Sequence, residues 1–206
     1  MSKNEALEHF LKNGAANCSQ QFVVGMTEYL KKENRALSVD QLTEALKQLL
    51  NDCVENNTIE LVRYIQISLM RSKAMTGEAF YRLESYGENF FLDEPYTSRV
   101  LDFPWIYGGY KTFCMSIDRE SRKYVGKIAS EELKRIKLIE LISCNKVIKM
   151  LLGDSVIDLM ITDEFRALSI DKGVQVQMGD YRGEYDLIIK TDAHTANIGE
   201  LLHGIL

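Results

Sequence analysis

The spacing of apolar residues changes within the first seventy positions, and this change constrains the fold more than any other feature of the chain. From residue 38 to residue 57 apolar residues recur every three or four positions, which predicts an amphipathic helix. From residue 59 to residue 70 they recur at every second position, which predicts a strand with one apolar face and one partly polar face. A sheet of this kind is covered by helices on one side, so the pattern predicts a chain that combines helices with a sheet.

The N-terminal third is predicted to be helical throughout. Ser2 and Glu5 have the spacing of a capping box, and a first short helix is predicted to end near Gly14. Asn17 is predicted to cap a second helix that ends at about Lys32. The third helix is predicted to begin at a capping box that starts at Ser38.

Two antiparallel hairpins are predicted, at about 59–92 and about 174–190. In the first, a strand at about 78–86 returns along the strand at 59–70, and residues 90–92 extend it. The second hairpin has its turn at Asp180-Tyr181-Arg182-Gly183.

The middle of the chain is predicted to supply two further helices. One starts near Pro104 and runs to about Tyr124, and the other opens at Ser130 and stops at Gly153. Hairpins that are separated by helices favour an α+β fold over a doubly wound parallel sheet. We therefore predict an α+β fold in one compact domain, residues 1–206, in which residues 1–57 could form a helical N-terminal lobe.

Composition and charge exclude several classes of protein. Lys and Arg number 25 against 30 Asp and Glu, a formal net charge of −5, which makes a nucleic acid partner unlikely. No apolar run approaches the roughly 20 residues of a membrane span, so no membrane partner is expected. The polar start of the chain shows no secretory signal, and a soluble cytoplasmic protein is predicted.

The sequence shows no signature of catalysis or of a bound metal. Phosphate-binding loops, nucleophile elbows and zinc-binding helices are absent, and histidine is scarce. The four cysteines are far apart in sequence and predict buried free thiols. No cofactor and no metal are expected, and whether the protein is an enzyme stays open, with a non-catalytic role favoured.

Three sets of residues are candidates for ligand binding, each with a structural alternative. The aromatic residues Trp105, Tyr107 and Tyr110 could line a pocket or fill one end of the core. Arg63, on the apolar face of the first strand, could meet an anion or pair with Glu84 or Asp102. Basic side chains near the end of the helix that is predicted to start at Pro104 could meet phosphate or face solvent; they are Arg119, Arg122 and Lys123.

Two functions follow as hypotheses. The first is a non-catalytic protein-interaction or regulatory module whose partner could be a second copy of the chain, because a terminal hairpin leaves a sheet edge to be covered. The second is a protein, which could be an enzyme, that binds a small molecule or phosphate at the aromatic residues near 103–110 and nearby Arg and Lys.

Overall fold

The computed structural model describes residues 1–31, 33–76, 81–168 and 172–191. The α-helices are α1 (Lys3–His9), α2 (Ala16–Tyr29), α3 (Glu33–Glu55), α4 (Arg71–Thr76), α5 (Pro104–Arg122), α6 (Ser130–Met160) and α7 (Asp163–Arg166). A π-helix, η1 (Phe10–Ala15), and two 3₁₀ helices, η2 (Ile59–Leu61) and η3 (Phe90–Leu92), accompany them. The strands are β1 (Tyr64–Leu69), β2 (Tyr81–Tyr86), β3 (Thr97–Leu101), β4 (Gln175–Asp180) and β5 (Tyr185–Lys190).

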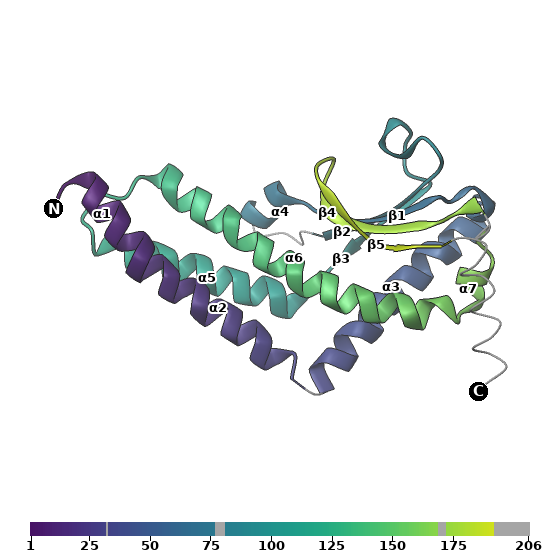
Figure 1. Ribbon diagram of the computed structural model, residues 1–206, viewed down its shortest axis with the longest axis horizontal. Helices are drawn as coiled ribbons and strands as arrows, with labels where there is room; N and C mark the ends of the chain where they lie inside the picture. The colour runs from purple at the N-terminus through teal and green to yellow at the C-terminus, as the bar shows by residue number, and fades with distance from the viewer. Residues whose placement is uncertain (32, 77–80, 169–171, 192–206) are drawn as a thin grey trace.

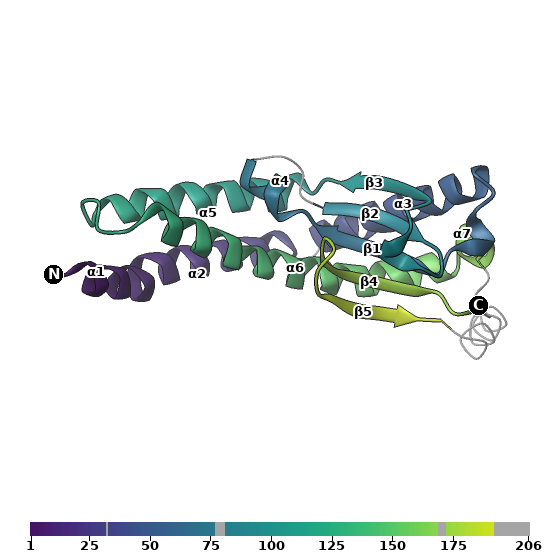
Figure 2. The ribbon, with the colours of Figure 1, turned by 90° about the horizontal axis from the view of Figure 1, so that it is seen from above.

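The molecule is elongated, with a sheet at one end and helices alone at the other (Figures 1 and 2). Helix α3 and the C-terminal half of α6 lie against one face of the sheet. Helices α1, α2 and α5, together with the N-terminal half of α6, project beyond the sheet and are called the helical arm below. The predicted α+β class and the helical N-terminal region are confirmed. The assignment of the whole chain to one domain stays a prediction.

The two predicted hairpins join into one five-stranded sheet. Its strand order is β3-β2-β1-β4-β5, so β1 lies at the centre. Strand β1 pairs antiparallel with β2 and parallel with β4, whereas β4 and β5 form an antiparallel pair. Ile67, in the middle of β1, lies opposite Leu83 on one side and Met178 on the other.

The inner face of the sheet packs on the helices and holds its apolar residues. Ile65 and Ile67 are completely buried there. Two polar contacts fix the helices to this face: the Cys53 thiol of α3 lies 3.2 Å from Ser85 Oγ, and the Tyr81 hydroxyl donates to Asn145 Oδ1 of α6 at 3.0 Å. The period-2 pattern therefore predicted correctly which residues of β1 face the helices.

The N-terminal helices are continuous where the sequence predicted a break. The capping box is confirmed, since Glu5 N–H donates to Ser2 Oγ and Ser2 N–H to Glu5 Oε2. The helix does not end at Gly14 but widens into η1 and continues as α2, so the predicted cap at Asn17 is wrong. Gly14 is buried against the Phe10 ring, and this packing keeps the glycine within the helix.

Two more predicted helix boundaries are wrong. Helix α3 begins at Glu33, and Ser38 lies inside it, where its hydroxyl donates to the Asn34 carbonyl. Helix α6 runs through Gly153 to Met160, because buried residues on both sides of the glycine, including Leu152 and Val156, hold it in the helix. Tertiary packing outweighs the roughly 1 kcal/mol that a glycine costs in a helix.

The first hairpin differs from its prediction at both ends. Residues 59–61 and 90–92 form the helices η2 and η3 instead of strand, and residues 78–80 of the predicted second strand lie outside the described residues. The sequence did not predict strand β3. Arg99 secures β3 to α3, because its Nε and Nη2 each lie 2.7 Å from the carboxylate of Asp52 and lower the pKa of that carboxyl group.

Candidate functional site

A groove of about 300 Å³ runs between α2 and α5 in the helical arm. Its floor is apolar, formed by Phe22, Met26 and Phe113, all of which are buried. Cys18 and Tyr29 lie at its two ends on α2, eleven residues apart, which corresponds to about 16 Å along a helix. The groove is therefore elongated and apolar along most of its length. Its full lining is Cys18, Gln21, Phe22, Gly25, Met26, Tyr29, Trp105, Gly109, Thr112, Phe113 and Ser116.

Glycines on both helices make room for this groove. A Cβ atom at Gly25 would meet no atom within 4 Å, so the space beside it is open. At Gly109 a Cβ atom would come within 3.1 Å of the Phe22 ring, so this glycine lets α5 approach the floor of the groove. The groove thus depends on the absence of side chains at these two positions.

Trp105, the only tryptophan of the chain, closes one end of the groove. Its ring stacks on that of Tyr29, with centroids 4.6 Å apart and an interplanar angle of 16°. The Trp105 Nε1 atom is buried and has no acceptor among the described residues. A buried indole N–H usually finds a partner, so Trp105 has an unused hydrogen-bond donor beside the groove.

Cys18, at the opposite end, is a poor nucleophile. Burial raises the pKa of its thiol, and the Glu120 carboxylate adds to that effect, while Arg119 and Lys123 oppose it. The thiol form is therefore favoured at neutral pH, and the thiol is not the reactive species. The chemistry available in the groove is binding through apolar contacts and hydrogen bonds.

The structure separates the aromatic residues that the sequence grouped together. Tyr107 and Tyr110 line a second cavity, of about 330 Å³, with Lys111 and Lys137. The Tyr110 hydroxyl donates to the Lys137 carbonyl at 2.9 Å, and burial raises its pKa far above the usual value. Tyr110 thus acts mainly as a core residue that joins α5 to α6, and Trp105 alone of the three lines the groove.

The basic candidates lie at the C-terminal end of α5. None of them lines the groove, although Arg119 and Lys123 are near enough to Cys18 at its end to oppose the rise in the pKa of that thiol. Arg119 is fourteen residues from Trp105, about 21 Å along the helix. Lys123 pairs with Glu120 at 2.6 Å. Arg119 and Arg122 are exposed, which agrees with the alternative of a solvent-facing helix end.

Arg63 lies just before β1, remote from the other candidates. Its Nη1 donates to the carbonyls of Glu60 and Val62, and its Nε lies 4.0 Å from the Glu88 carboxylate. The predicted partners, Glu84 and Asp102, are wrong, because the nearest cation to Glu84 is Arg82. Two backbone carbonyls thus accept from this buried guanidinium, and whether Arg63 also binds an anion stays a prediction.

The sequence did not predict the contribution of α2 to the groove. The apolar spacing of its residues gave a helix face but did not show which helix would pack on it.

No family model, curated protein or solved structure matches the chain. In the part of the chain that the structure describes, no helix has the length and apolar character to cross a membrane.

Proposed function

We propose that the protein is a non-catalytic binding module that holds a small, elongated, mainly apolar molecule in the groove between α2 and α5. The observation that carries this proposal is the buried Trp105 N–H without an acceptor, at the end of an apolar groove. The groove volume is at the lower end of the roughly 300–1,000 Å³ typical of ligand pockets. The molecule proposed is an apolar chain with one hydrogen-bond acceptor, such as a carbonyl group, at the Trp105 end.

Two features of the groove support binding over catalysis, and the free cysteines support a location in a reducing compartment. The thiol in the groove is kept protonated by its surroundings, and no histidine is among the residues that line the groove. All four cysteines are free, which fits the proposed cytoplasmic location.

Fluorescence of the single tryptophan tests the proposal directly. We expect 2-decanone, which has an apolar chain and one acceptor, to change the emission of Trp105 in a saturable way. The alkene 1-decene, with the same chain and no carbonyl, is expected to bind about tenfold more weakly, because the indole N–H then stays unpaired.

Filling the groove supplies the matched variant. In Gly25→Leu the new side chain occupies the open space, and binding of 2-decanone should be lost while helix propensity keeps the protein at least as stable. Gly108→Leu is the control, since a Cβ there also meets open space but Gly108 does not line the groove. Undiminished binding by Gly25→Leu, or no binding by the unaltered protein, would contradict the proposal.

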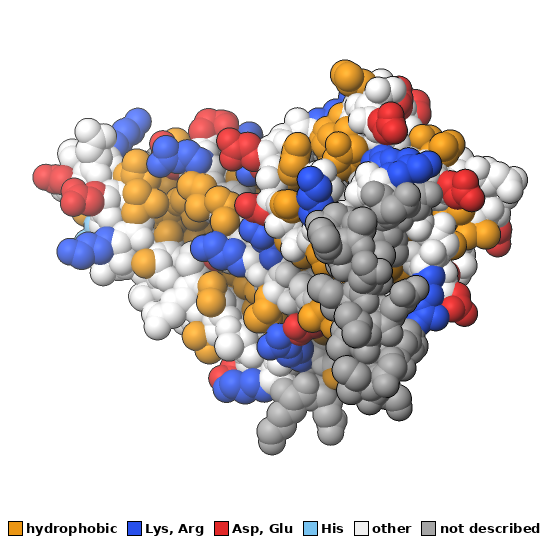
Figure 3. Space-filling view, turned by 45° about the vertical axis from the view of Figure 1, so that its right-hand side comes forward, with side chains coloured by type: hydrophobic (Ala, Val, Ile, Leu, Met, Phe, Trp, Pro, Cys, Tyr) orange, Lys and Arg blue, Asp and Glu red, His pale blue; other side chains and the backbone are white. Residues whose placement is uncertain are grey.

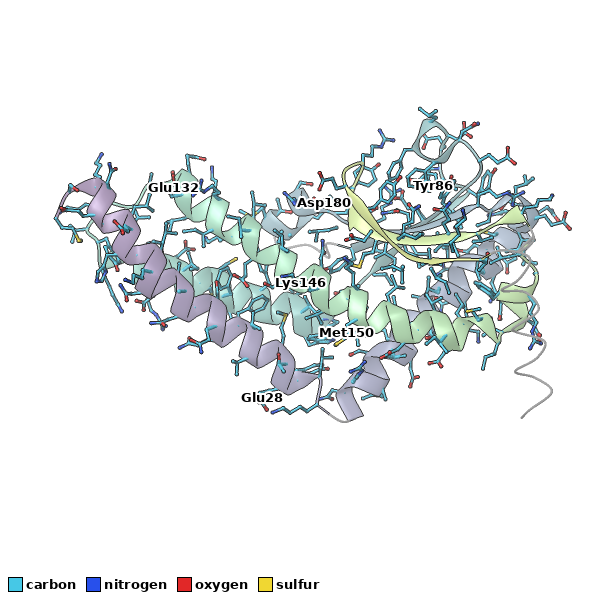
Figure 4. The ribbon with its side chains drawn as sticks, viewed as in Figure 1. Glu28, Tyr86, Glu132, Lys146, Met150 and Asp180 are labelled. Carbon is cyan, nitrogen blue, oxygen red and sulfur yellow. The ribbon has the colours of Figure 1, made fainter. Side chains whose placement is uncertain are left out.

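Self-association is a second candidate function, favoured by exposed apolar side chains beside the edge strand β5. Figure 3 shows hydrophobic side chains on the surface of the helical arm, and several more lie along the exposed side of α6. Those on α6 have exposed fractions between 43% and 66%; they are Ile139, Ile142, Met150 and Ile157. Leu187 of β5 is 52% exposed. Met150 is labelled on α6 in Figure 4.

We propose that two copies pair through their β5 edges, related by a twofold axis, which brings Leu187 of one copy close to Leu187 of the other. Light scattering during size-exclusion chromatography should then give twice the chain mass of 23.6 kDa. Leu187→Lys should shift the protein to one chain, whereas Leu92→Lys, at a residue 90% exposed in η3, should not. A mass of one chain throughout the micromolar range would refute the dimer.

A further inference from the structure

The outer face of the sheet, away from α3 and α6, carries a row of buried polar side chains. Gln66 of β1 lies opposite Glu84 of β2 and opposite Gln177 of β4, so three neighbouring strands contribute to the row. Ser68 follows two residues later on the same face of β1. All four side chains are at most 2% exposed. We call this set the oxygen row: Gln66, Ser68, Glu84 and Gln177.

Each residue of the oxygen row has a buried oxygen that receives no hydrogen bond from the described residues. These atoms are Gln66 Oε1, Ser68 Oγ, Glu84 Oε2 and Gln177 Oε1. The two amide nitrogens are already used, because Gln66 Nε2 donates to the Ile67 carbonyl and Gln177 Nε2 to Gln175 Oε1. Buried acceptors without donors are costly and rare, and four on adjacent positions of one sheet face require a common explanation.

Aromatic side chains accompany the row on the outer face. Tyr86, labelled above the sheet in Figure 4, contacts the ring of Phe90 from η3 at a centroid distance of 5.3 Å. At the other end, the Arg82 guanidinium lies over the Tyr181 ring, 5.9 Å from its centroid. The oxygens are thus enclosed rather than open to solvent.

The charge of the row is incompletely compensated. The Arg82 Nε lies 3.2 Å from Glu84 Oε1 and leaves Oε2 of the same carboxylate unpaired. Oε2 of this carboxylate therefore has no positively charged partner among the described residues. A cation at Oε2 would supply that charge.

We propose that the oxygen row binds a single monovalent metal cation, Na⁺ or K⁺. All four free atoms are oxygens, the ligands that hard cations prefer. The row has one carboxylate, already shared with Arg82, and this low charge favours a monovalent ion over Ca²⁺ or Mg²⁺. Among the described residues no cluster of three His, Cys, Asp or Glu could hold a metal, so the proposed site combines the single Glu84 carboxylate with amide and hydroxyl oxygens.

Thermal unfolding at constant ionic strength tests the site. The melting temperature in about 150 mM NaCl or KCl is expected to exceed that in equimolar choline chloride by ~2–4 °C, because an ion that binds only the folded state stabilises it. Parallel samples with MgCl₂ and CaCl₂ show whether divalent ions also raise the melting temperature. Broadening of the sodium NMR signal by the protein, reversed by KCl, reports binding directly.

Two variants and a control assign the effect to the row. Ser68→Ala removes one free oxygen and should reduce the salt-specific shift to below about 1 °C. Ser130→Ala is the matched control, because Ser130 is exposed at the start of α6, away from the sheet; the shift should persist. Glu84→Gln replaces the carboxylate by an amide whose N–H groups can donate to neighbouring oxygens, so its melting temperature in choline chloride should rise while the shift disappears.

Four results would overturn the proposal. They are equal melting temperatures in alkali and choline chloride, a shift that survives Ser68→Ala, stabilisation by divalent ions only, and a Glu84 carboxyl group that NMR finds protonated at neutral pH in both salts. In the last case a proton, not a metal ion, occupies the row.

Discussion

Gly179→Ala is expected to destabilise the protein by about 3 kcal/mol or more, a large share of the ~5–15 kcal/mol that holds a typical domain together. A Cβ atom at this position of β4 would lie 2.1 Å from the Glu184 carbonyl oxygen and 2.5 Å from Tyr185 Cα. Both are backbone atoms of the paired hairpin and cannot move without breaking the β4–β5 ladder. Urea unfolding followed by far-UV circular dichroism measures the loss.

Gly183→Ala is the control for that prediction. It lies in the same hairpin, but its Cβ would approach the Asp180 Cβ at 3.1 Å, which a small shift relieves. A change within about 1 kcal/mol is expected. Equal effects of the two substitutions would mean that the close approach at Gly179 is not what constrains the hairpin.

Ile67→Ala is expected to have the second large effect and to lower the free energy of unfolding by ~2–5 kcal/mol. Ile67 is completely buried at the centre of the central strand, between Leu83 and Met178, so truncation leaves a cavity beneath the helices. Urea titration of the variant and of the unaltered protein measures this loss of stability. Val100→Ala on the edge strand β3, at a residue 68% exposed, should cost less than about 0.5 kcal/mol. A cost below 1 kcal/mol at Ile67 would contradict the packing described for the sheet.

The sequence predicted those features of the fold that depend on local periodicity. The alternation through Ile65, Ile67 and Leu69 assigned the inner face of β1 correctly, and the capping box at Ser2 marked the first helix. It did not predict β3, whose ladder with β2 and ion pair between Arg99 and Asp52 both depend on residues outside the strand itself. Nor did it predict the parallel pairing of β1 with β4, which no local signal encodes.

The candidate sites were predicted less completely, because both assemble side chains from distant segments. Trp105 was chosen from the sequence and does line the groove, but its partner Tyr29 could be placed there only once α2 was known to pack on α5. Gln66 and Ser68 were assigned to the second, partly polar face of their strand. Nothing in their spacing indicated that this face is also buried, or that Gln177 completes the row.

The parallel ladder between β1 and β4 has a consequence for how the chain acquires its structure. Residues 70–174 separate the two strands, so their pairing closes a very long loop and forms slowly compared with the neighbouring β1–β2 hairpin. During synthesis, β1 has left the ribosome long before β4 is made. Because Gln66, Ser68 and Glu84 lie on the early strands and Gln177 on the late one, the oxygen row is completed only in the last stage of folding.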